Sequence, residues 1–497
     1  MLLTGLLSVL SPVVLITILG GVVLGIIFGS IPGLSATMAV ALCLPISFGM
    51  PTVQGVALLL GLYIGGISGG LISAILIKIP GTPSSVATLF DGAPMAERGQ
   101  AGKALGTGIL FSFLGTVFSV ILLMFLSPPI AKFALKFSPY EYFAVTVFSL
   151  TLIASLSEGS MLKGLLSGCV GIAIAMVGAA PLDSFQRFSY GHFNLSLGFQ
   201  LLSVLIGFYA IPEILVAARD AATIEEKPID FQMKGFGLSM KEFVGQLPNA
   251  LRSALIGLGI GLLPGIGGGT SNLIAYASAK KASKHPEKFG TGIVDGIVAS
   301  ETSNNASIGG ALIPLLTLGI PGDTVTAMLL GGLMMQGVIP GPMLFKNNGP
   351  LVYSIFGALF VASVMMLLVE FGGIRMFVRL LKIPKNILLS VVLCLCVVGA
   401  IASNNRLFDA YAMIAFGLLG YWLTKMKFPL PPLILGFILS PTLETNLRRG
   451  MQLSGGDFIP FLTRPISMVF LGIAMISFFG SIIHDVRRTS MNKKAKA

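Results

Sequence analysis

Long apolar runs separated by short polar stretches dominate this chain and restrict the folds open to it. A straight helix needs about 20 apolar residues to cross a bilayer, and several runs reach that length. Only 10% of the 497 residues are charged, whereas soluble domains carry about 25%. The sequence therefore predicts an all-α polytopic membrane protein, because helices satisfy their own backbone polar groups in lipid.

The apolar runs also divide the chain. In the first half they lie at 10–29, 34–50, 53–79, 104–131, 139–157, 160–180 and 198–216. In the second half they lie at 250–263, 266–280, 292–320, 323–340, 350–372, 386–402, 408–424, 429–441 and 464–484. The shorter runs are candidates for half-helices or re-entrant hairpins. We divide the chain into a first transmembrane repeat (1–216), a polar linker (217–248), a second transmembrane repeat (249–484) and a basic tail (485–497).

The net charge of +12 is interpreted as membrane topology rather than as nucleic-acid binding. Basic residues gather in loops and in the C-terminal tail, and basic loops stay cytoplasmic. We therefore expect a cytoplasmic C-terminus. The four cysteines lie in apolar runs, which predicts buried free thiols rather than metal ligands or a disulfide.

The two halves share matched motifs. Each holds two Pro-Gly pairs, Pro32-Gly33 matching Pro264-Gly265, and Pro80-Gly81 matching Pro321-Gly322. The residues around the second pair align without a gap. Because the first half has an odd number of predicted segments, we expect the second half to be inverted in the membrane. Interrupted apolar segments at matching positions in two halves are typical of binding sites in secondary transporters.

Each Pro-Gly pair is expected to end or bend a helix, because Pro removes a backbone donor and Gly relaxes the backbone. Hydroxyls or an acid follow each pair, in "LSAT", "TPSS", "IGGGTSN" and "DTVT". Such residues cap helix N-termini, and the exposed backbone N–H groups there attract carboxylates. The alternatives are a cap alone or close helix packing. Four breaks in two matched pairs favour a binding site.

A second polar cluster, "ETSNNAS" at 301–307, lies in an apolar context. Polar residues inside a membrane are costly and are functional candidates, and an amide can both donate to a carboxylate and offer an oxygen to sodium. The alternative is a loop between two helices. We single out the acids Glu301 and Asp323, each expected to bind a coupling cation, accept a proton or cap a helix. Asp91 is expected in a solvated loop.

Nothing in the sequence supports an enzyme. It contains no Gly-x-x-x-x-Gly-Lys-Ser/Thr loop for ATP and no Gly-x-Ser-x-Gly nucleophile motif. Its three histidines are scattered without metal-ligand spacing. We therefore expect no cofactor and no metal site beyond a coupling ion, Na⁺ or H⁺.

Four separated motifs closely resemble the large membrane subunit of the tripartite tricarboxylate transporters. They are "GSIPGLSATMAVALCLPISFGM", "IKIPGTPSSVATLFDGAPMA", "GLLPGIGGGTSNLIAYASAKK" and "ETSNNASIGGALIPLLTLGIPGD". The resemblance covers about residues 15–480. It implies a permease of the bacterial inner membrane that works with a small membrane subunit and a periplasmic solute-binding protein. It also implies import of a di- or tricarboxylate such as citrate, driven by sodium or protons.

The motifs carry the residues that we assign to binding. The carboxylate site is expected to include Ser35, Thr37, Thr82, Ser84, Ser85, Thr270, Ser271, Asn272, Asn304, Asn305 and Thr324. The glycines expected to bring backbone close to the ligand are Gly33, Gly81, Gly265, Gly267, Gly268 and Gly322. Asn304 and Asp323 are the expected cation ligands.

The sequence leaves several points open. An elevator-like movement, in which a block holding the broken helices slides against a scaffold, is a hypothesis drawn from the paired breaks. The alternatives for function are transport of another organic anion by the same architecture, an anion channel, or a structural membrane scaffold. A homo-oligomer is also open.

Overall fold

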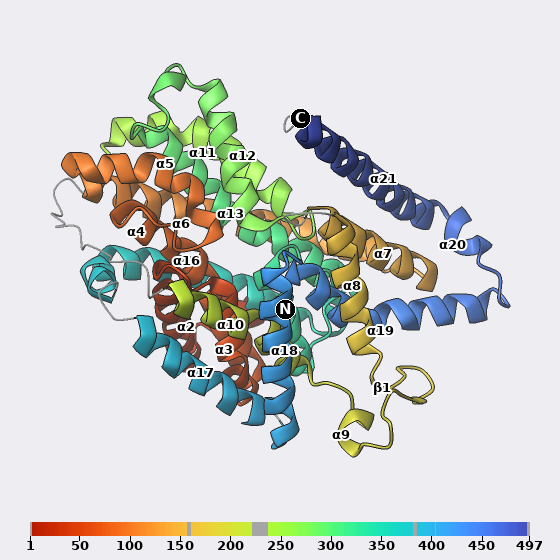
Figure 1. The fold of residues 1–497 in the computed structure, drawn as a ribbon. Helices are drawn as coiled ribbons and strands as arrows, with labels where there is room; N and C mark the ends of the chain where they lie inside the picture. Colours follow the sequence, from red (N-terminus) through yellow and green to blue (C-terminus); the bar gives the residue numbers. More distant parts are fainter. Residues whose placement is uncertain (1, 157–160, 221–236, 381–384, 403, 495–497) are drawn as a thin grey trace. The chain divides into compact units, whose positions relative to one another are not determined.

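The computed structural model describes residues 2–156, 161–220, 237–380, 385–402 and 404–494, and these residues are almost entirely helical (Figure 1). Among them, six helices are long and apolar enough to cross a membrane. Shorter apolar helices accompany these six. The expectation of an all-helical, multi-pass membrane protein is confirmed.

The elements follow in chain order. Those of the first half are α1 (Leu2–Val9), α2 (Pro12–Ser30), α3 (Ala36–Phe48), α4 (Thr52–Leu76), η1 (Pro83–Ser85), α5 (Val86–Met95), η2 (Ala96–Gln100), α6 (Ala101–Ala134), α7 (Pro139–Leu156), α8 (Met161–Ala175), β1 (Gly178–Ala179), β2 (Gln186–Arg187), α9 (Phe193–Ser196) and α10 (Leu201–Asp220). Those of the second half are α11 (Met240–Gly261), α12 (Gly267–Ala282), η3 (Pro286–Lys288), α13 (Val294–Leu318), α14 (Thr324–Met335), α15 (Pro342–Asn347), α16 (Gly349–Leu380), α17 (Lys385–Ala402), α18 (Leu407–Lys425), α19 (Leu430–Leu453), α20 (Ile459–Thr463) and α21 (Pro465–Lys494).

Each predicted apolar segment coincides with a helix, and most of the boundaries move by a few residues. The short helix α5 is not among the predicted segments. The stretch 217–248, predicted as a polar linker, is helical at its described ends, in α10 and α11, while 221–236 lie outside the described residues. The tail predicted at 485–497 continues α21 as far as Lys494, and 495–497 also lie outside them.

The four cysteines are free thiols, as predicted, but only two of them are buried. Cys43 and Cys396 are buried, whereas Cys169 on α8 and Cys394 on α17 are exposed. Their apolar context fits either position, because an apolar run in a membrane helix can face lipid as well as protein.

Contacts group the chain into two compact units, each assembled from both halves of the sequence. Unit 1 comprises Met1–Ala131 and Glu213–Ser403, and unit 2 comprises Lys132–Pro212 and Asn404–Ala497. All four Pro-Gly pairs belong to unit 1. The candidate site therefore lies within one compact unit.

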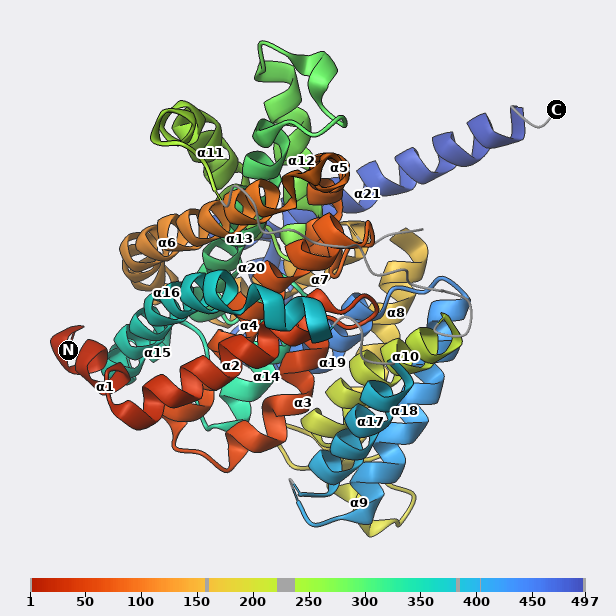
Figure 2. The same ribbon diagram turned by 90° about the vertical axis from the view of Figure 1, so that its left-hand side faces the viewer.

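Helices α2 and α4 pack closely against each other and are the first pair of long helices in unit 1. Helix α16 lies alongside them (Figure 2). Small residues allow it: a Cβ on Gly21 of α2 would lie 2.5 Å from the Leu58 carbonyl oxygen, and one on Gly61 of α4 would lie 2.8 Å from that of Ile18. Glycine is required at such crossings because helices in lipid associate through van der Waals contact of closely approaching backbones.

The second half packs α11 against α13 by the same means. A Cβ on Gly261 of α11 would lie 2.5 Å from the Ser307 carbonyl oxygen, and one on Gly310 of α13 would lie 2.5 Å from that of Leu258. In Figure 1, α12 and α13 lie beside α5, so elements from both halves meet in unit 1. Large apolar side chains are exposed on the long helices, Phe125 of α6 at 73% among them, as lipid contact requires.

Unit 2 contains the helices α7, α8, α19 and α21, which pack on one another. A short antiparallel hairpin pairs Gly178 of β1 with Arg187 of β2. The Arg187 guanidinium donates to both carboxylate oxygens of Glu444 on α19, at 3.2 and 2.9 Å. This bidentate geometry is the stronger form of an ion pair, and it attaches the hairpin to α19.

Candidate functional site

Each Pro-Gly pair separates two helices, as predicted. Pro32-Gly33 lies between α2 and α3, and Pro264-Gly265 lies between α11 and α12. Gly33 and Gly265 have φ angles of +91° and +85°, a region that residues with a Cβ rarely adopt. The matched glycines thus make the same left-handed turn, and this conformation explains why both positions carry glycine.

Residues after the breaks cap the helices that follow. The Ser35 hydroxyl accepts from the backbone N–H of Met38 in α3 at 3.1 Å. Asp323 caps α14, where its Oδ1 accepts from the backbone N–H and from the hydroxyl of Thr326, both at 2.7 Å. The second oxygen of Asp323 accepts from the Tyr63 hydroxyl at 2.6 Å. Of the three roles considered for Asp323, the structure shows the helix cap, and both of its oxygens have protein donors.

The four breaks converge within unit 1. The backbone N–H of Gly265 donates to the Gly322 carbonyl at 2.8 Å. The hydroxyls of Thr37 and Thr324 are 3.1 Å apart. The Asn272 amide donates to the carbonyl of Ser84. Hydrogen bonds therefore link the third break to the second and the fourth, and the first break to the fourth.

Asn304 lies beside the second and third breaks with its amide unused. Its side chain is fully buried on α13, yet neither its nitrogen nor its oxygen has a hydrogen-bond partner among the described residues. A Cβ on Gly268 of α12 would lie 2.8 Å from the Asn304 oxygen and 3.1 Å from the hydroxyl oxygens of Ser307 and Ser84. The glycine thus leaves a polar space, defined here by Ser84, Gly268, Asn304 and Ser307, which we call the Asn304 space.

Other polar atoms lack partners in the same unit. The Asn272 amide oxygen and the Thr82 hydroxyl are buried without a hydrogen bond among the described residues. The Thr82 hydroxyl points toward α4, since a Cβ on Gly70 would lie 2.5 Å from it. Unpaired buried polar atoms cost about 1–3 kcal/mol each, so several of them together are an unusual feature that a polar ligand would relieve.

Not every candidate residue lies in the Asn304 space. Asn305 is turned toward α6, where its oxygen accepts from the Thr116 hydroxyl at 3.4 Å. Thr270 is exposed on α12, and Ser271 donates to the Gly268 carbonyl at 3.1 Å. The Ser85 hydroxyl donates to the Thr82 carbonyl at 2.9 Å within the second break.

Three of the candidate glycines lie close to other parts of the protein. A Cβ on Gly322 would lie 2.6 Å from the Gly261 carbonyl oxygen, and one on Gly81 would meet that of Gly29. A Cβ on Gly267 would lie 2.9 Å from the Asp323 Cβ. At these positions the small residue allows backbone to approach backbone or a neighbouring cap.

Sequence reasoning missed two acids in apolar runs, the half-buried Glu213 and the buried Glu370. The Ser35 hydroxyl, at the first break, lies 3.0 and 2.8 Å from the two oxygens of the Glu213 carboxylate on α10. Glu370 is fully buried on α16. The signal was present for both, because each is an acid within an apolar run and such residues are functional candidates.

The placement expected for Asp91 was wrong. It lies in helix α5, is fully buried, and is not in a solvated loop. One of its oxygens accepts from the backbone N–H groups of Gly290, Gly292 and Ile293 at 2.8–3.0 Å. The other accepts from the Tyr276 hydroxyl at 2.9 Å.

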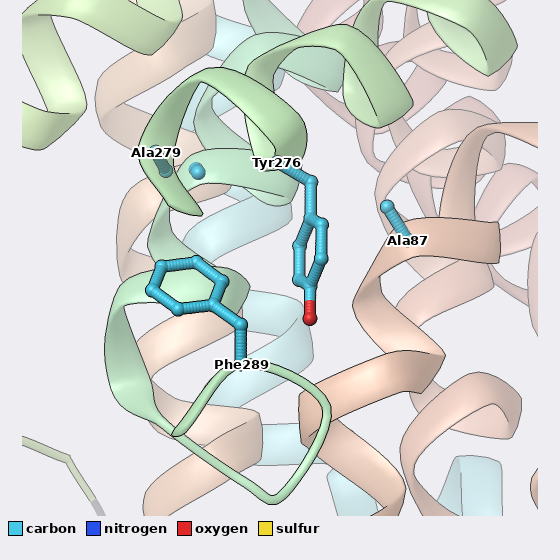
Figure 3. Packing of buried hydrophobic residues seen from close by; sticks show 5 residues of the cluster. Ala87, Tyr276, Ala279 and Phe289 are labelled. Atoms are coloured by element: carbon cyan, nitrogen blue, oxygen red, sulfur yellow. The ribbon is translucent and has the colours of Figure 1, made fainter. Parts of the chain in front are cut away.

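The Tyr276 ring stands between Ala87 and Phe289, as Figure 3 shows. Its ring centroid is 5.3 Å from that of Phe289, in an edge-on arrangement. Asp91 and Tyr276 together therefore fix the loop before α13 against α5. This loop leads into the helix that carries Asn304.

The arrangement has the chemistry of an anion-binding site. The free Asn304 nitrogen is a donor, and the hydroxyls of Ser84 and Thr82 can donate or accept. The Ser307 hydroxyl donates to the Asn304 backbone carbonyl at 2.6 Å and can still accept. Helices α12 and α14 begin directly after the third and fourth breaks. The positive end of a helix dipole lies at each of these N-termini and favours a negative ligand. No Lys or Arg side chain forms an ion pair within the Asn304 space among the described residues.

The chain is similar to known proteins. Residues 15–435 match the model of a family described as "Tripartite tricarboxylate transporter TctA family". The chain is 35% identical over 480 residues to an uncharacterized 52.8 kDa protein in the TAR-I ttuC′ 3′ region of Agrobacterium vitis, which covers 97% of this chain and 95% of that protein. It is also 35% identical over 228 residues to an uncharacterized protein in the TAR-II ttuC′ 3′ region of the same organism, covering 46% of this chain and 94% of that protein. No solved structure matches the chain.

Proposed function

We propose a transport function from one established premise, which is that this chain belongs to the tripartite tricarboxylate transporter TctA family. It is therefore the large membrane subunit of a tripartite transporter and not an enzyme. We propose that it imports a di- or tricarboxylate of the citrate class across the bacterial inner membrane. Its partners in this proposal are a small membrane subunit and a periplasmic solute-binding protein that delivers the substrate.

The observation that carries the proposed site is the unpaired amide of Asn304. It is fully buried in unit 1, it has no partner among the described residues, and helix breaks from both halves surround it. A carboxylate accepting from its N–H group would satisfy the amide, and hydrogen bonds to charged groups contribute about 1.5–3 kcal/mol. Further polar groups near the same breaks can contact the carboxylate in this proposal. They belong to Ser84, Ser307, Thr82 and Asn272.

The remaining candidates act around this centre in the proposal. Thr37 and Thr324 close one side through their hydroxyl pair, and Ser35 holds the first break to Glu213. If the coupling ion is sodium, the oxygens of Asn304 and Asp323 are the candidate ligands. Transport is secondary and symport in this scheme, driven by a sodium or proton gradient.

We further propose that the halves are inverted repeats. Support comes from the matching pairs α2 with α4 and α11 with α13, which pack through glycines and are each followed by a Pro-Gly break. The equal turns at Gly33 and Gly265 add to this support.

An elevator-like movement of unit 1 fits the same observations. All four breaks belong to unit 1, and two helices that continue from one unit into the other contain prolines near the change, Pro128 and Pro129 in α6 and Pro212 in α10. Proline within a helix is a common cause of a kink.

The test of the elevator-like movement is disulfide crosslinking of a break residue to one helix of unit 2. A crosslink that forms unchanged in both inward- and outward-facing states would exclude such a movement.

Uptake by proteoliposomes that contain all three subunits tests the function. Labelled citrate and a panel of other carboxylates are offered with and without sodium and pH gradients. We expect saturable uptake that stops when the driving gradient is dissipated. Uptake that persists without any gradient and does not saturate would indicate a channel, and uptake of a different organic anion alone would assign another substrate to the same architecture.

A further inference from the structure

Two glutamates are buried in unit 1 without a basic partner. Glu301 on α13 and Glu370 on α16 are both 0% exposed. The Ser68 hydroxyl on α4 donates to Glu370, and a Cβ on Gly108 of α6 would lie 3.5 Å from the Leu71 side chain on α4 and 3.6 Å from Glu301 Cγ. Because Ser68 and Leu71 are three residues apart and share a face of α4, the two carboxyl groups lie near each other. Neither forms an ion pair with Lys, Arg or His in the part of the chain that the structure describes. An uncompensated carboxylate in such surroundings is strongly disfavoured by its loss of hydration.

The hydrogen bonds that the pair receives come from hydroxyl groups. The oxygens of Glu301 accept from the hydroxyls of Thr88 on α5 and Ser112 on α6, the latter at 2.8 Å. Glu370 Oε2 accepts from the Ser68 hydroxyl on α4 at 2.9 Å. Glu370 Oε1 has no partner among the described residues, although it is fully buried. This unpaired oxygen needs a donor.

Other titratable groups on the helices around the pair are engaged elsewhere or exposed. On α4 Tyr63 donates to Asp323, and on α5 Asp91 accepts from Tyr276. On α6 Lys103 pairs with Glu242, and on α13 Asp295 accepts from Gln246. On α16 Arg375 and Arg379 are exposed. Among the described residues of these helices, the two glutamates are therefore the buried acids that accept hydrogen bonds from hydroxyl groups alone.

A proton shared by Glu301 and Glu370 would remove one of the two buried charges and supply the donor that Glu370 Oε1 lacks. Two neighbouring carboxyl groups in a site of low polarity do not both ionise easily, and such pairs take up one proton between them. We propose that Glu301 and Glu370 bind one proton between them and that this proton is the coupling ion of the transporter. The inference rests on the proposed function for its coupling role, and on the geometry alone for proton binding.

The pair is linked to the Asn304 space through two helices. Glu301 precedes Asn304 by three residues on α13, and the Asn305 amide donates to the Glu301 carbonyl at 3.1 Å. On α4, Ser68 contacts Glu370 while Tyr63 contacts the Asp323 cap of α14. Loss or gain of the proton therefore changes hydrogen bonding on the helices that form the substrate site. The proton enters from one side of the membrane and leaves on the other, and no covalent step is involved.

Infrared difference spectroscopy tests proton binding without any substrate. The full-length chain in lipid is titrated with acid and base, and the carbonyl stretch of a protonated, buried carboxyl group is followed. We expect this band in the wild type at neutral pH and its loss in the double variant E301Q/E370Q. The variant E97Q, in which an exposed glutamate paired with Lys78 is changed, serves as the control and retains the band.

Two spectroscopic results would overturn the proposal. One is a wild type without the band at neutral pH, and the other is a folded double variant in which the band persists unchanged. Thermal unfolding of each purified variant shows whether it is folded. If the double variant does not fold, the wild-type spectrum and the single variants E301Q and E370Q still decide, because each must alter the band.

Transport by the complete three-subunit system in proteoliposomes tests the coupling role. With the membrane potential held at zero and sodium absent, a gradient of one pH unit supplies about 1.4 kcal/mol per proton, which is a tenfold accumulation. We expect the wild type to accumulate labelled citrate under this gradient. We expect E370Q to lose the accumulation while it still exchanges external labelled citrate for internal unlabelled citrate.

The outcomes separate the two hypotheses. Accumulation that follows a sodium gradient and ignores the pH gradient, or E370Q that accumulates as the wild type does, would refute the coupling proton. A variant that loses exchange as well as accumulation while remaining folded would refute it too, because the pair would then serve binding. If the wild type transports none of the carboxylates in the panel, the proposed function fails, and the infrared result still decides whether the pair binds a proton.

Discussion

The hydroxyl of Tyr63 on α4 donates a 2.6 Å hydrogen bond to the carboxylate of Asp323, the cap of α14. The two residues lie 260 positions apart in the sequence, and the bond joins a long helix of the first half to the fourth break in the second half. Both side chains are buried. This contact fixes the start of α14 relative to α4.

We predict that Tyr63→Phe destabilises the protein by about 1–3 kcal/mol, because it leaves a buried Asp323 oxygen without its donor. Thermal unfolding of the purified protein in detergent measures the change. Tyr411→Phe is the matched control, since Tyr411 is 67% exposed, and it should leave the unfolding temperature nearly unchanged. Equal unfolding temperatures for wild type and Tyr63→Phe would contradict the prediction.

Replacement of Asn304 by Ala separates binding from folding. Its amide has no partner among the described residues, so Asn304→Ala breaks no hydrogen bond of that amide and should leave stability nearly unchanged, whereas it removes a donor to the carboxylate. A lost hydrogen bond to a charged group corresponds to about 10- to 100-fold weaker binding. Calorimetry or saturation of uptake measures the binding, and thermal unfolding measures the stability.

The control for Asn304→Ala is Asn446→Ala on α19, where the amide donates to the Thr442 carbonyl on an exposed surface. It should leave uptake unchanged. A large loss of stability in Asn304→Ala with unchanged affinity for substrate would show that Asn304 serves packing and not binding.

A methyl group at Gly268 should occupy the Asn304 space. The added Cβ would lie 2.8 Å from the Asn304 oxygen and 3.1 Å from two hydroxyl oxygens, so Gly268→Ala should reduce uptake strongly. Stability should change little, because Ala gains up to about 1 kcal/mol over Gly within a helix, which offsets the crowding. Gly259→Ala on α11 is the control, since nothing lies within 4 Å of its Cβ position. Uptake by Gly268→Ala equal to that of Gly259→Ala would exclude the space from binding.

The helices themselves could be predicted because lipid makes the sequence pattern simple. Apolar runs bounded by Gly, Pro or charges are the parts that can satisfy their backbone in a bilayer, and each such run became a helix. The breaks were equally clear, because Pro-Gly within an apolar run removes a backbone donor and disfavours the helix at that point. The helix cap was one of the three roles expected for Asp323 from its place directly after Pro321-Gly322, and it is the one that the structure shows.

The partners of acids in the helices could not be predicted in the same way. Whether Asp91 is solvated depends on a loop about 200 residues later that brings three backbone N–H groups to it. Likewise, the contact of Ser68 with Glu370 and that of Ser35 with Glu213 depend on which helices pack together. Periodicity within one segment carries no information about such pairings. The same reason explains why Asn304 and Asn305, adjacent and chemically identical, face different helices.

Acid should weaken the start of α11. Lys103 on α6 and the Ser239 cap lower the pKa of Glu242 from 4.5 to about 2. Because the folded-state pKa lies below the unfolded value, Glu242 contributes stability above about pH 4.5 and loses it as the pH falls from 4.5 toward 2. The contribution is small, since the side chain is largely exposed to solvent and screened by it.

We therefore predict that Glu242→Gln lowers the unfolding temperature at pH 7 and that the difference from wild type shrinks as the pH falls from about 4.5 to about 3. Thermal unfolding at several pH values measures it. Lys103→Met should reproduce part of the loss at neutral pH, because Lys103 is the largest cause of the shift. A difference that stays constant with pH would contradict the assignment.

Removal of the Asp91 carboxylate should release the loop before α13. Three backbone N–H groups and the Tyr276 hydroxyl donate to it, and each buried donor left unpaired costs about 1–3 kcal/mol. Asp91→Ala should therefore lower stability by about 3 kcal/mol or more and speed hydrogen exchange at Gly290, Gly292 and Ile293. Mass spectrometry of exchanged peptides measures the second effect. Asp457→Ala is the control, because that carboxylate accepts from the backbone N–H group of Ile459 on an exposed surface. This control should leave hydrogen exchange at 290–293 unchanged. Unchanged exchange at 290–293 in Asp91→Ala would contradict the prediction and show that other contacts hold the loop.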